Sequence, residues 1–111
     1  MNSDFAPFIF SEHEGNFSLM LTEFDSFAEV FEEAGYDAGG YAWHGVADAL
    51  IRLHAPYLAK KIQFDPEASM FVAYGKDRTA LKELARLLLR TMRDEVLLKT
   101  ALENADPELM D

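Results

Sequence analysis

The sequence predicts an α+β domain in which an antiparallel sheet, built from two β-hairpins, has helices packed on one face, in the order ββααββαα. Three kinds of observation predict this class: segments with the period-two alternation of half-buried strands, segments with the apolar period of helices, and turn-forming residues between them. The chain has 111 residues and half of them are apolar. That is enough for one domain, residues 1–111, with its own core.

The strands are expected in two hairpins. Phe17, Leu19 and Leu21 alternate with the residues between them, which predicts a strand with one buried face. The turn Glu14-Gly15-Asn16 precedes this strand, and Gly and Asn tolerate the positive φ of a tight hairpin turn. Pro66-Glu67-Ala68 supplies a second turn. The expected strands cover residues 8–12, 17–22, 62–65 and 69–74.

Four helices are expected from apolar residues spaced at three and four positions. In the second, Trp43 shares a stripe with Val46 and Leu50, so we expect Trp43 to lie in the core. Asp77 suits the N-cap of the third helix. The chain from about residue 105 is acidic and is expected to fray. The expected helices cover residues 25–34, 41–54, 77–92 and 95–104.

The net charge of −10 belongs entirely to the first half of the chain. Residues 1–51 contain ten carboxylates and no Lys or Arg, whereas residues 52–111 contain ten basic and ten acidic residues. A fold that gathers the first half on one side has a negative face, which attracts cationic surfaces and disfavours nucleic acid as a partner. The chain has no Cys, no secretory leader pattern and no apolar run long enough for a membrane, so a cytoplasmic protein is expected.

No metal, cofactor or catalytic group is expected. The three histidines, His13, His44 and His54, lack the spacing of a helical metal site, and the glycines of residues 35–40 lack the Lys of a phosphate loop. Acid–base catalysis would need one carboxylate of a pair in an apolar pocket. The adjacent pair Glu32 and Glu33 and the turn pair Asp65 and Glu67 are instead expected in solvent.

Two charged or aromatic features leave alternatives open. Tyr36 and Tyr41 bracket the glycine loop, and they either cap the start of a helix or form a contact surface. Arg78, Lys82, Arg86 and Arg90 recur every four residues. They form a solvated helix face, or they pair with the acidic half of the same molecule or of a second copy.

Two segments carry a resemblance to a known family. GYDAGGYAWHGVADALI (Gly35–Ile51) resembles the glycine–tyrosine–tryptophan helix start of the immunity protein 51 family. FDPEASMFVAYGKDRTALKELARLL (Phe64–Leu88) resembles the Asp-x-Glu hairpin, the Phe-containing strand and the following helix of that family. The resemblance covers roughly residues 8–100. The residues at motif positions are Tyr36, Asp37, Gly39, Tyr41, Trp43, Asp65, Glu67 and Phe71.

The resemblance implies a small cytoplasmic antidote of a bacterial polymorphic toxin system, which binds and neutralises a cognate toxin domain without catalysis. Toxins that act on nucleic acids, such as nucleases, have basic clefts, so an acidic antidote fits such a partner. The alternatives are a self-associating structural or adaptor module and a small enzyme that uses Asp65 or Glu67. The expected partner-binding residues are Glu32, Glu33, Tyr36, Asp37, Tyr41, Asp65 and Glu67.

Overall fold

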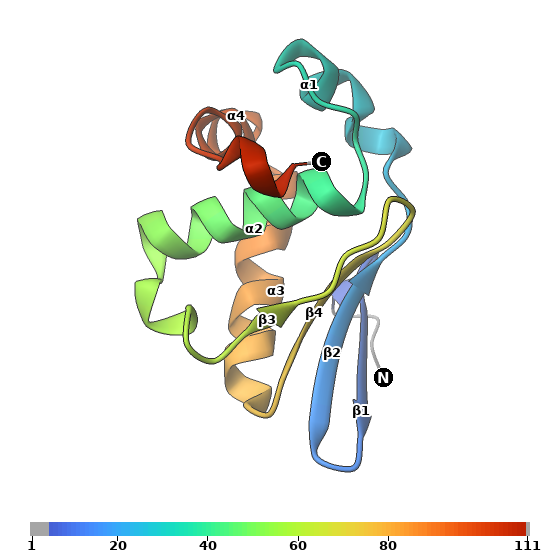
Figure 1. The fold of residues 1–111 in the computed structure, drawn as a ribbon, viewed down its shortest axis with the longest axis vertical. Coiled ribbons are helices and arrows are strands. Elements are labelled where there is room, and N and C mark those ends of the chain that lie inside the picture. Colours follow the sequence, from blue (N-terminus) through green and yellow to red (C-terminus); the bar gives the residue numbers. More distant parts are fainter. Residues whose placement is uncertain (1–4, 111) are drawn as a thin grey trace.

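The computed structural model describes residues 5–110 and has the predicted α+β architecture and element order (Figure 1). The strands are β1 (Ile9–His13), β2 (Asn16–Leu21), β3 (Gln63–Phe64) and β4 (Phe71–Gly75). The helices are α1 (Ala28–Glu33), α2 (Gly40–His54), α3 (Arg78–Met92) and α4 (Glu95–Glu103). Short 3₁₀ helices span Asp25–Phe27, Pro56–Leu58 and Pro107–Leu109.

The four strands form one antiparallel sheet in the order β1–β2–β4–β3, so the second hairpin joins the first through β2 and β4. The register pairs Leu19 with Ala73 and Leu21 with Phe71. All four side chains are buried. The buried face that the alternation in β2 predicts is therefore confirmed, and β4 continues it across the sheet.

The helices pack on the buried face of this sheet. Helices α2 and α3 contact the strands, and α4 packs on both helices, while α1 lies at one end of the molecule (Figure 1). The predicted cap of α3 is confirmed, because the Asp77 carboxylate accepts a hydrogen bond from the Ala80 N–H at 3.1 Å. Asp94 caps α4 in the same way, through the N–H groups of Val96 and Leu97.

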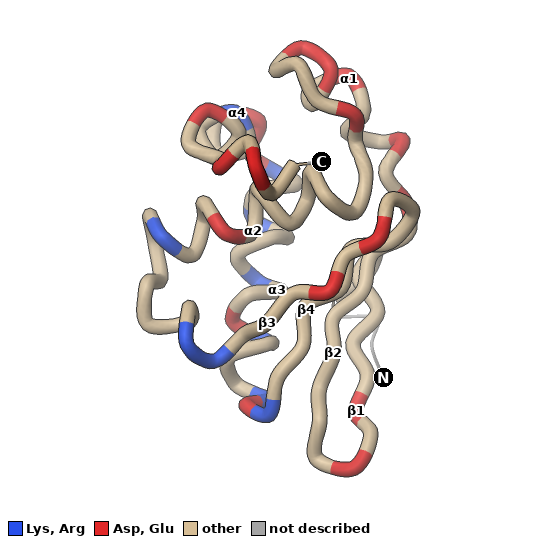
Figure 2. Tube along the Cα trace, viewed as in Figure 1, with Lys and Arg blue, Asp and Glu red and all other residues tan. Residues whose placement is uncertain are grey.

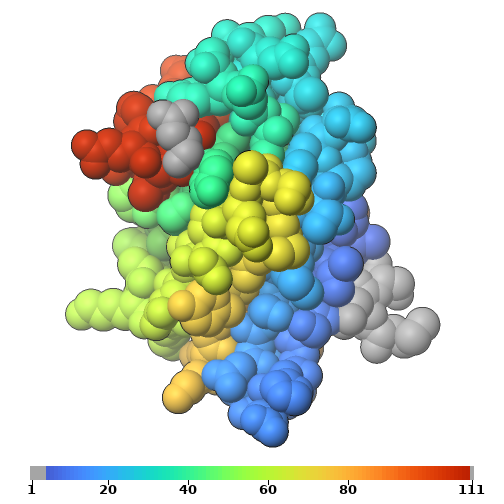
Figure 3. Space-filling model, turned by 45° about the vertical axis from the view of Figure 1, so that its right-hand side comes forward, coloured from blue at the N-terminus to red at the C-terminus, as the bar shows by residue number. Residues whose placement is uncertain are grey.

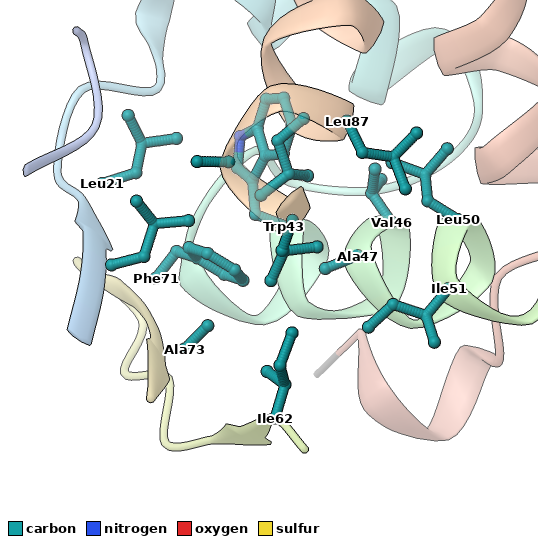
Figure 4. Packing of buried hydrophobic residues seen from close by; sticks show 14 of the residues in the cluster. Leu21, Trp43, Val46, Ala47, Leu50, Ile51, Ile62, Phe71, Ala73 and Leu87 are labelled. Atoms are coloured by element: carbon teal, nitrogen blue, oxygen red, sulfur yellow. The ribbon is translucent and has the colours of Figure 1, made fainter. Parts of the chain in front are cut away.

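Trp43 lies at the centre of the core, as its helical stripe predicts (Figure 4). Its ring centroid is 5.2 Å from that of Phe31, 5.9 Å from Phe27 and 6.5 Å from Phe8. Two of these rings come from the α1 region and one from the segment before β1. Trp43 therefore joins α1, α2 and the start of the sheet, although its indole N–H has no hydrogen-bond acceptor among the described atoms.

The expected fraying after residue 105 is not what the structure shows. Asp106 accepts a hydrogen bond from the Glu108 N–H at 3.0 Å and starts the last 3₁₀ helix. Met110 is buried, and its thioether occupies the space that a side chain on Gly45 would fill. The acidic composition of this segment gave no sign of that contact, which depends on a glycine 65 residues earlier in the chain.

Candidate functional site

A group of acidic residues without a Lys or Arg partner lies at one end of the molecule, around α1 and the turn between β3 and β4 (Figure 2). All of them are exposed, and none forms an ion pair with a Lys or Arg of residues 5–110. Other carboxylates of the first half do have partners: Glu12 pairs with Arg78 at 2.7 Å, and Asp48 pairs with Arg52 at 2.9 Å. We call the unpaired group the acidic end. Its members are Glu29, Glu32, Glu33, Asp37, Asp65 and Glu67.

An open cleft of about 520 Å³ lies within the acidic end and brings four of the predicted residues together. Figure 3 shows the three segments that meet there: the loop before α2, the β3–β4 turn and the end of the chain. The other six lining residues were not predicted to bind a partner, and two of them, Ala68 and Met110, come from distant parts of the sequence. The lining residues are Glu32, Gly35, Tyr36, Asp37, Ala38, Gly39, Tyr41, Ala42, Ala68 and Met110.

The potential in this cleft is set by two opposing contributions. Helix α2 begins there without a side-chain cap, and a helix N-terminus carries the equivalent of about half a positive charge. Glu32 and Asp37 contribute two full negative charges, and no Lys or Arg lines the cleft. The carboxylates outweigh the dipole, so the cleft favours cationic groups.

Gly39 and Gly40 allow the start of α2 to lie directly against the β3–β4 turn, and this contact forms one side of the cleft. Gly40 donates a hydrogen bond from its N–H to the Ala68 carbonyl at 3.2 Å. A Cβ on Gly39 would lie 2.8 Å from the same oxygen, and a Cβ on Gly40 would overlap the carbonyl oxygens of Glu67 and Met70. The start of α2 therefore rests directly on the backbone of the β3–β4 turn. The two segments that resemble the immunity protein 51 family meet at this contact, which the sequence did not predict.

The remaining predicted residues lie near the cleft but not in it. Glu33 faces a smaller groove of about 240 Å³ between α1 and α4, together with Lys99 and Leu102. Asp65 donates a backbone hydrogen bond to the Val72 carbonyl at 3.1 Å, and Glu67 exchanges two backbone bonds with Met70, at 2.8 and 3.1 Å. Both of these turn carboxylates are exposed. The structure thus places Asp65 and Glu67 beside the cleft and Glu33 on the other side of α1.

The motif positions divide into residues that support the fold and residues that are accessible. Trp43 and Phe71 are completely buried in the core, and Gly39 makes the close approach to the turn. Tyr36 and Tyr41 are half-buried and line the cleft, so each presents part of its ring to solvent.

Three of the basic side chains on α3 contact aromatic rings of the same molecule. Arg78 lies 5.3 Å from the centroid of the Phe17 ring, Lys82 lies 5.8 Å from that of Phe10, and Arg86 lies 6.0 Å from that of Phe5. The three rings follow one another at 5.8 and 6.1 Å between centroids. We call these six residues the cation–aromatic face. Arg78 also pairs with Glu12 of the acidic half at 2.7 Å, whereas Arg78, Arg86 and Arg90 all remain exposed, as expected of a solvated helix face.

The histidines do not cluster. His44 stacks on Phe64 with 4.6 Å between ring centroids. Burial lowers the pKa of His44, and the nearby Asp48 carboxylate partly opposes this shift. Among residues 5–110, no group of three or more His, Asp or Glu side chains is placed to hold a metal ion.

The comparison with protein families identifies the chain. The family model described as Immunity protein 51 matches residues 8–107, so the chain belongs to this family. No curated protein and no solved structure matches the chain significantly. Within the described part of the chain, every helix is too short or too polar to cross a membrane.

Proposed function

We propose that this chain is a non-enzymatic immunity protein that binds a cognate bacterial toxin domain in the cytoplasm and neutralises it through the acidic end. Membership of the immunity protein 51 family supports an immunity role and a toxin partner. The observation that carries the choice of surface is the cleft lined by Glu32, Tyr36, Asp37 and Tyr41. It combines unpaired charge with accessible aromatic rings.

The chemistry of this surface suits a basic protein partner. Carboxylates without partners keep their full field, which extends about one Debye length, roughly 8 Å at physiological ionic strength, before salt screens it. That field steers a cationic partner and raises its association rate. Tyrosines then supply rigid contact area, and they are frequent among the residues that dominate interface energies.

A toxin that acts on nucleic acid fits this description. Its active-site cleft must attract phosphates, so it presents Lys and Arg side chains. The acidic end offers carboxylates in place of phosphates. An antidote bound there blocks the substrate's path without performing any reaction on the toxin.

The structure supports the alternatives less well. Self-association of the acidic half on the basic helix is weakened because Arg78, Lys82 and Arg86 already cover aromatic rings of the same molecule. A carboxylate enzyme would need an acid in an apolar pocket. Asp65 and Glu67 are exposed on a turn and lack that environment.

The test measures association with candidate toxin domains taken from the genes that neighbour the gene for this chain. Asp37→Lys should slow association at low salt by tenfold or more, because steering depends on the charge near the contact. Co-expression of the toxin with this variant should also rescue growth less well than co-expression with the parent.

The matched control is Glu14→Lys. Glu14 is an exposed carboxylate in the β1–β2 turn, which lies at the opposite end of the molecule from α1 (Figure 1). Glu14→Lys changes the net charge by the same amount as Asp37→Lys. Equal slowing by both variants would assign the effect to net charge alone, and the acidic end would lose its role as the binding surface.

A further inference from the structure

The outer face of the sheet has an unusual composition. Along antiparallel strands side chains alternate between the two faces, and a face in solvent is normally polar or charged. Here the helices cover only the opposite face. None of the outward side chains on the four strands is Asp, Glu, Lys or Arg. They are Ile9, Ser11, His13, Asn16, Ser18, Met20, Gln63, Val72 and Tyr74.

An apolar row crosses this face. The register places Ile9 opposite Met20 and Met20 opposite Val72, so these three side chains lie side by side on three strands. Ile9 is 48% exposed, and Met20 and Val72 are half-buried. Contiguous exposed apolar side chains of this kind mark contact surfaces, because they lower the solubility of a protein that leaves them in water.

The neighbouring row is polar and is partly paired within the molecule. The hydroxyls of Ser11 and Ser18 share a hydrogen bond at 2.8 Å, and the Tyr74 hydroxyl donates to Gln63 Oε1 at 3.0 Å. The register aligns all four residues across the sheet. These two bonds already use the Tyr74 hydroxyl hydrogen and one serine hydroxyl hydrogen, so a partner that covers this row has to supply acceptors only for the Gln63 amide nitrogen and the remaining serine hydroxyl hydrogen.

The apolar row continues to the acidic end. Asp65 lies beside Val72 through its backbone hydrogen bond, and Met70, two residues before Val72, pairs with Glu67. The turn that contains Glu67 also supplies Ala68 to the cleft. The β3–β4 turn thus borders both the cleft and the outer sheet face, and it carries the negative charges of Asp65 and Glu67.

We propose that the outer face of the sheet is the second half of the toxin interface, and that it takes an apolar patch of the toxin bordered by Lys or Arg. This inference rests on the proposed function. Stable protein interfaces bury about 800 Å² on each partner, which is more than one cleft of this size provides. The sheet face is adjacent, has no outward Asp, Glu, Lys or Arg on its strands and is bordered by Asp65 and Glu67, so its chemistry complements such a patch. The toxin's basic groups then meet the acidic end, while its apolar patch covers the row from Ile9 to Val72.

The decisive experiment compares dissociation rates, and its probe is the toxin domain that binds the parent in the association test above. Ile9→Ser with Tyr74→Ser removes two exposed apolar groups and leaves the net charge at its parental value. We expect dissociation to become about tenfold faster, as for truncation of interface anchors, with an unchanged association rate. The matched control is Leu53→Ser with Val96→Ser, which removes two exposed apolar groups from α2 and α4 and should leave both rates unchanged.

A second measurement uses the absence of Cys from the chain. Ser18→Cys and Val96→Cys each introduce a single labelling site for a polarity-sensitive fluorophore. Toxin should shift the emission of the label at position 18 and leave that at position 96 unchanged. This readout does not depend on whether the double variant keeps its stability.

The outcomes separate this inference from the proposed function. Suppose that Asp37→Lys slows association, that Ile9→Ser with Tyr74→Ser leaves the dissociation rate unchanged, and that toxin does not shift the emission of the label at position 18. The sheet face is then not part of the interface, and the proposed function stands. If the parent forms no complex, both fall. If the label at position 18 responds to concentration of this chain alone, the occupant is a second copy and the inference is wrong.

Discussion

The acidic end and the cation–aromatic face are both rows of charged side chains in the sequence, but the molecule uses them differently. On α3, three cations each lie over a phenyl ring, and Arg78 also pairs with Glu12. At the acidic end the carboxylates form no ion pair within residues 5–110. The number of charged residues on a surface therefore does not measure the charge available to a partner. That charge depends on how many of these residues already have ion pairs or aromatic contacts within the molecule.

The reason for the difference lies in the side chains themselves. Lys and Arg have long apolar stems that cover rings while the charged head stays in water. Asp and Glu have short stems and no attraction to the face of an aromatic ring, whose potential is negative. A basic helix can therefore be absorbed into a small domain, whereas a cluster of acids without basic neighbours stays exposed and self-repelling.

The largest loss of unfolding free energy should come from a substitution of Trp43, which packs against Phe31 of α1 and so supports the acidic end. Trp43→Ala removes the ring that Phe8, Phe27 and Phe31 pack against, and it should cost about 3–5 kcal/mol of unfolding free energy. Chemical denaturation measures this loss, and Trp43→Phe should lose less. A Trp43→Ala variant that melts within a degree or two of the parent but no longer binds toxin would show that Trp43 is a contact residue.

The next effect concerns the contact that shapes the cleft. In Gly40→Ala the new methyl group would overlap two backbone carbonyl oxygens of the β3–β4 turn, and backbone cannot move aside as a flexible side chain can. We expect a loss of about 1–3 kcal/mol, with weaker toxin binding. Gly15→Ala is the comparison variant: its Cβ meets nothing within 4 Å, but its φ of +81° adds strain of about 1 kcal/mol. If Gly40→Ala is as stable as the parent, the overlap at Gly40 has no effect.

The sequence predicted most of the fold because its signals are local. The period-two alternation predicted the buried face of β2, and the helical spacing of apolar residues predicted that Trp43 lies in the core. Asp77 predicted where α3 begins. The cleft was only half predictable. Tyr36, Asp37 and Tyr41 are neighbours in sequence, whereas Ala68 and Met110 reach the cleft through tertiary packing on glycines. Long-range contacts of this kind leave no periodicity to detect.

The cation–aromatic face was missed for a related reason. The four-residue spacing of Arg78, Lys82 and Arg86 was visible, but the rings below them come from the segment before β1, from β1 and from β2. Their order along the helix is set by the hairpin register, which pairs Phe10 with Leu19 and Phe17 with Glu12 and so makes the two rings diagonal neighbours on the covered side.

A smaller effect should test whether this face is structural. Arg78→Met keeps an apolar stem over Phe17 but removes the charge, so it loses both the ring interaction and the pair with Glu12. For groups this exposed the expected loss is roughly 0.5–1 kcal/mol. Lys99→Met on α4 removes only an exposed pair with Glu95 at 4.0 Å and should lose a few tenths of a kcal/mol. Equal losses in urea denaturation would mean that the rings contribute nothing.

The smallest expected change is a gain in unfolding free energy, for Glu32→Lys. It tests most directly whether the charge of the acidic end is left unmatched by the fold. Glu32 lies in the last turn of α1 among other carboxylates, where both the helix dipole and like charges disfavour a negative group. Glu32→Lys should therefore raise the unfolding free energy by about 0.3–0.5 kcal/mol, and the gain should shrink in 1 M salt. Yet the same change should slow association with the toxin. A substitution that stabilises the protein while weakening its function indicates a charge kept for binding rather than for folding. If Glu32→Lys instead destabilises the fold by more than 1 kcal/mol, this carboxylate is part of the structure, and the acidic end is matched internally in the same way as the face on α3.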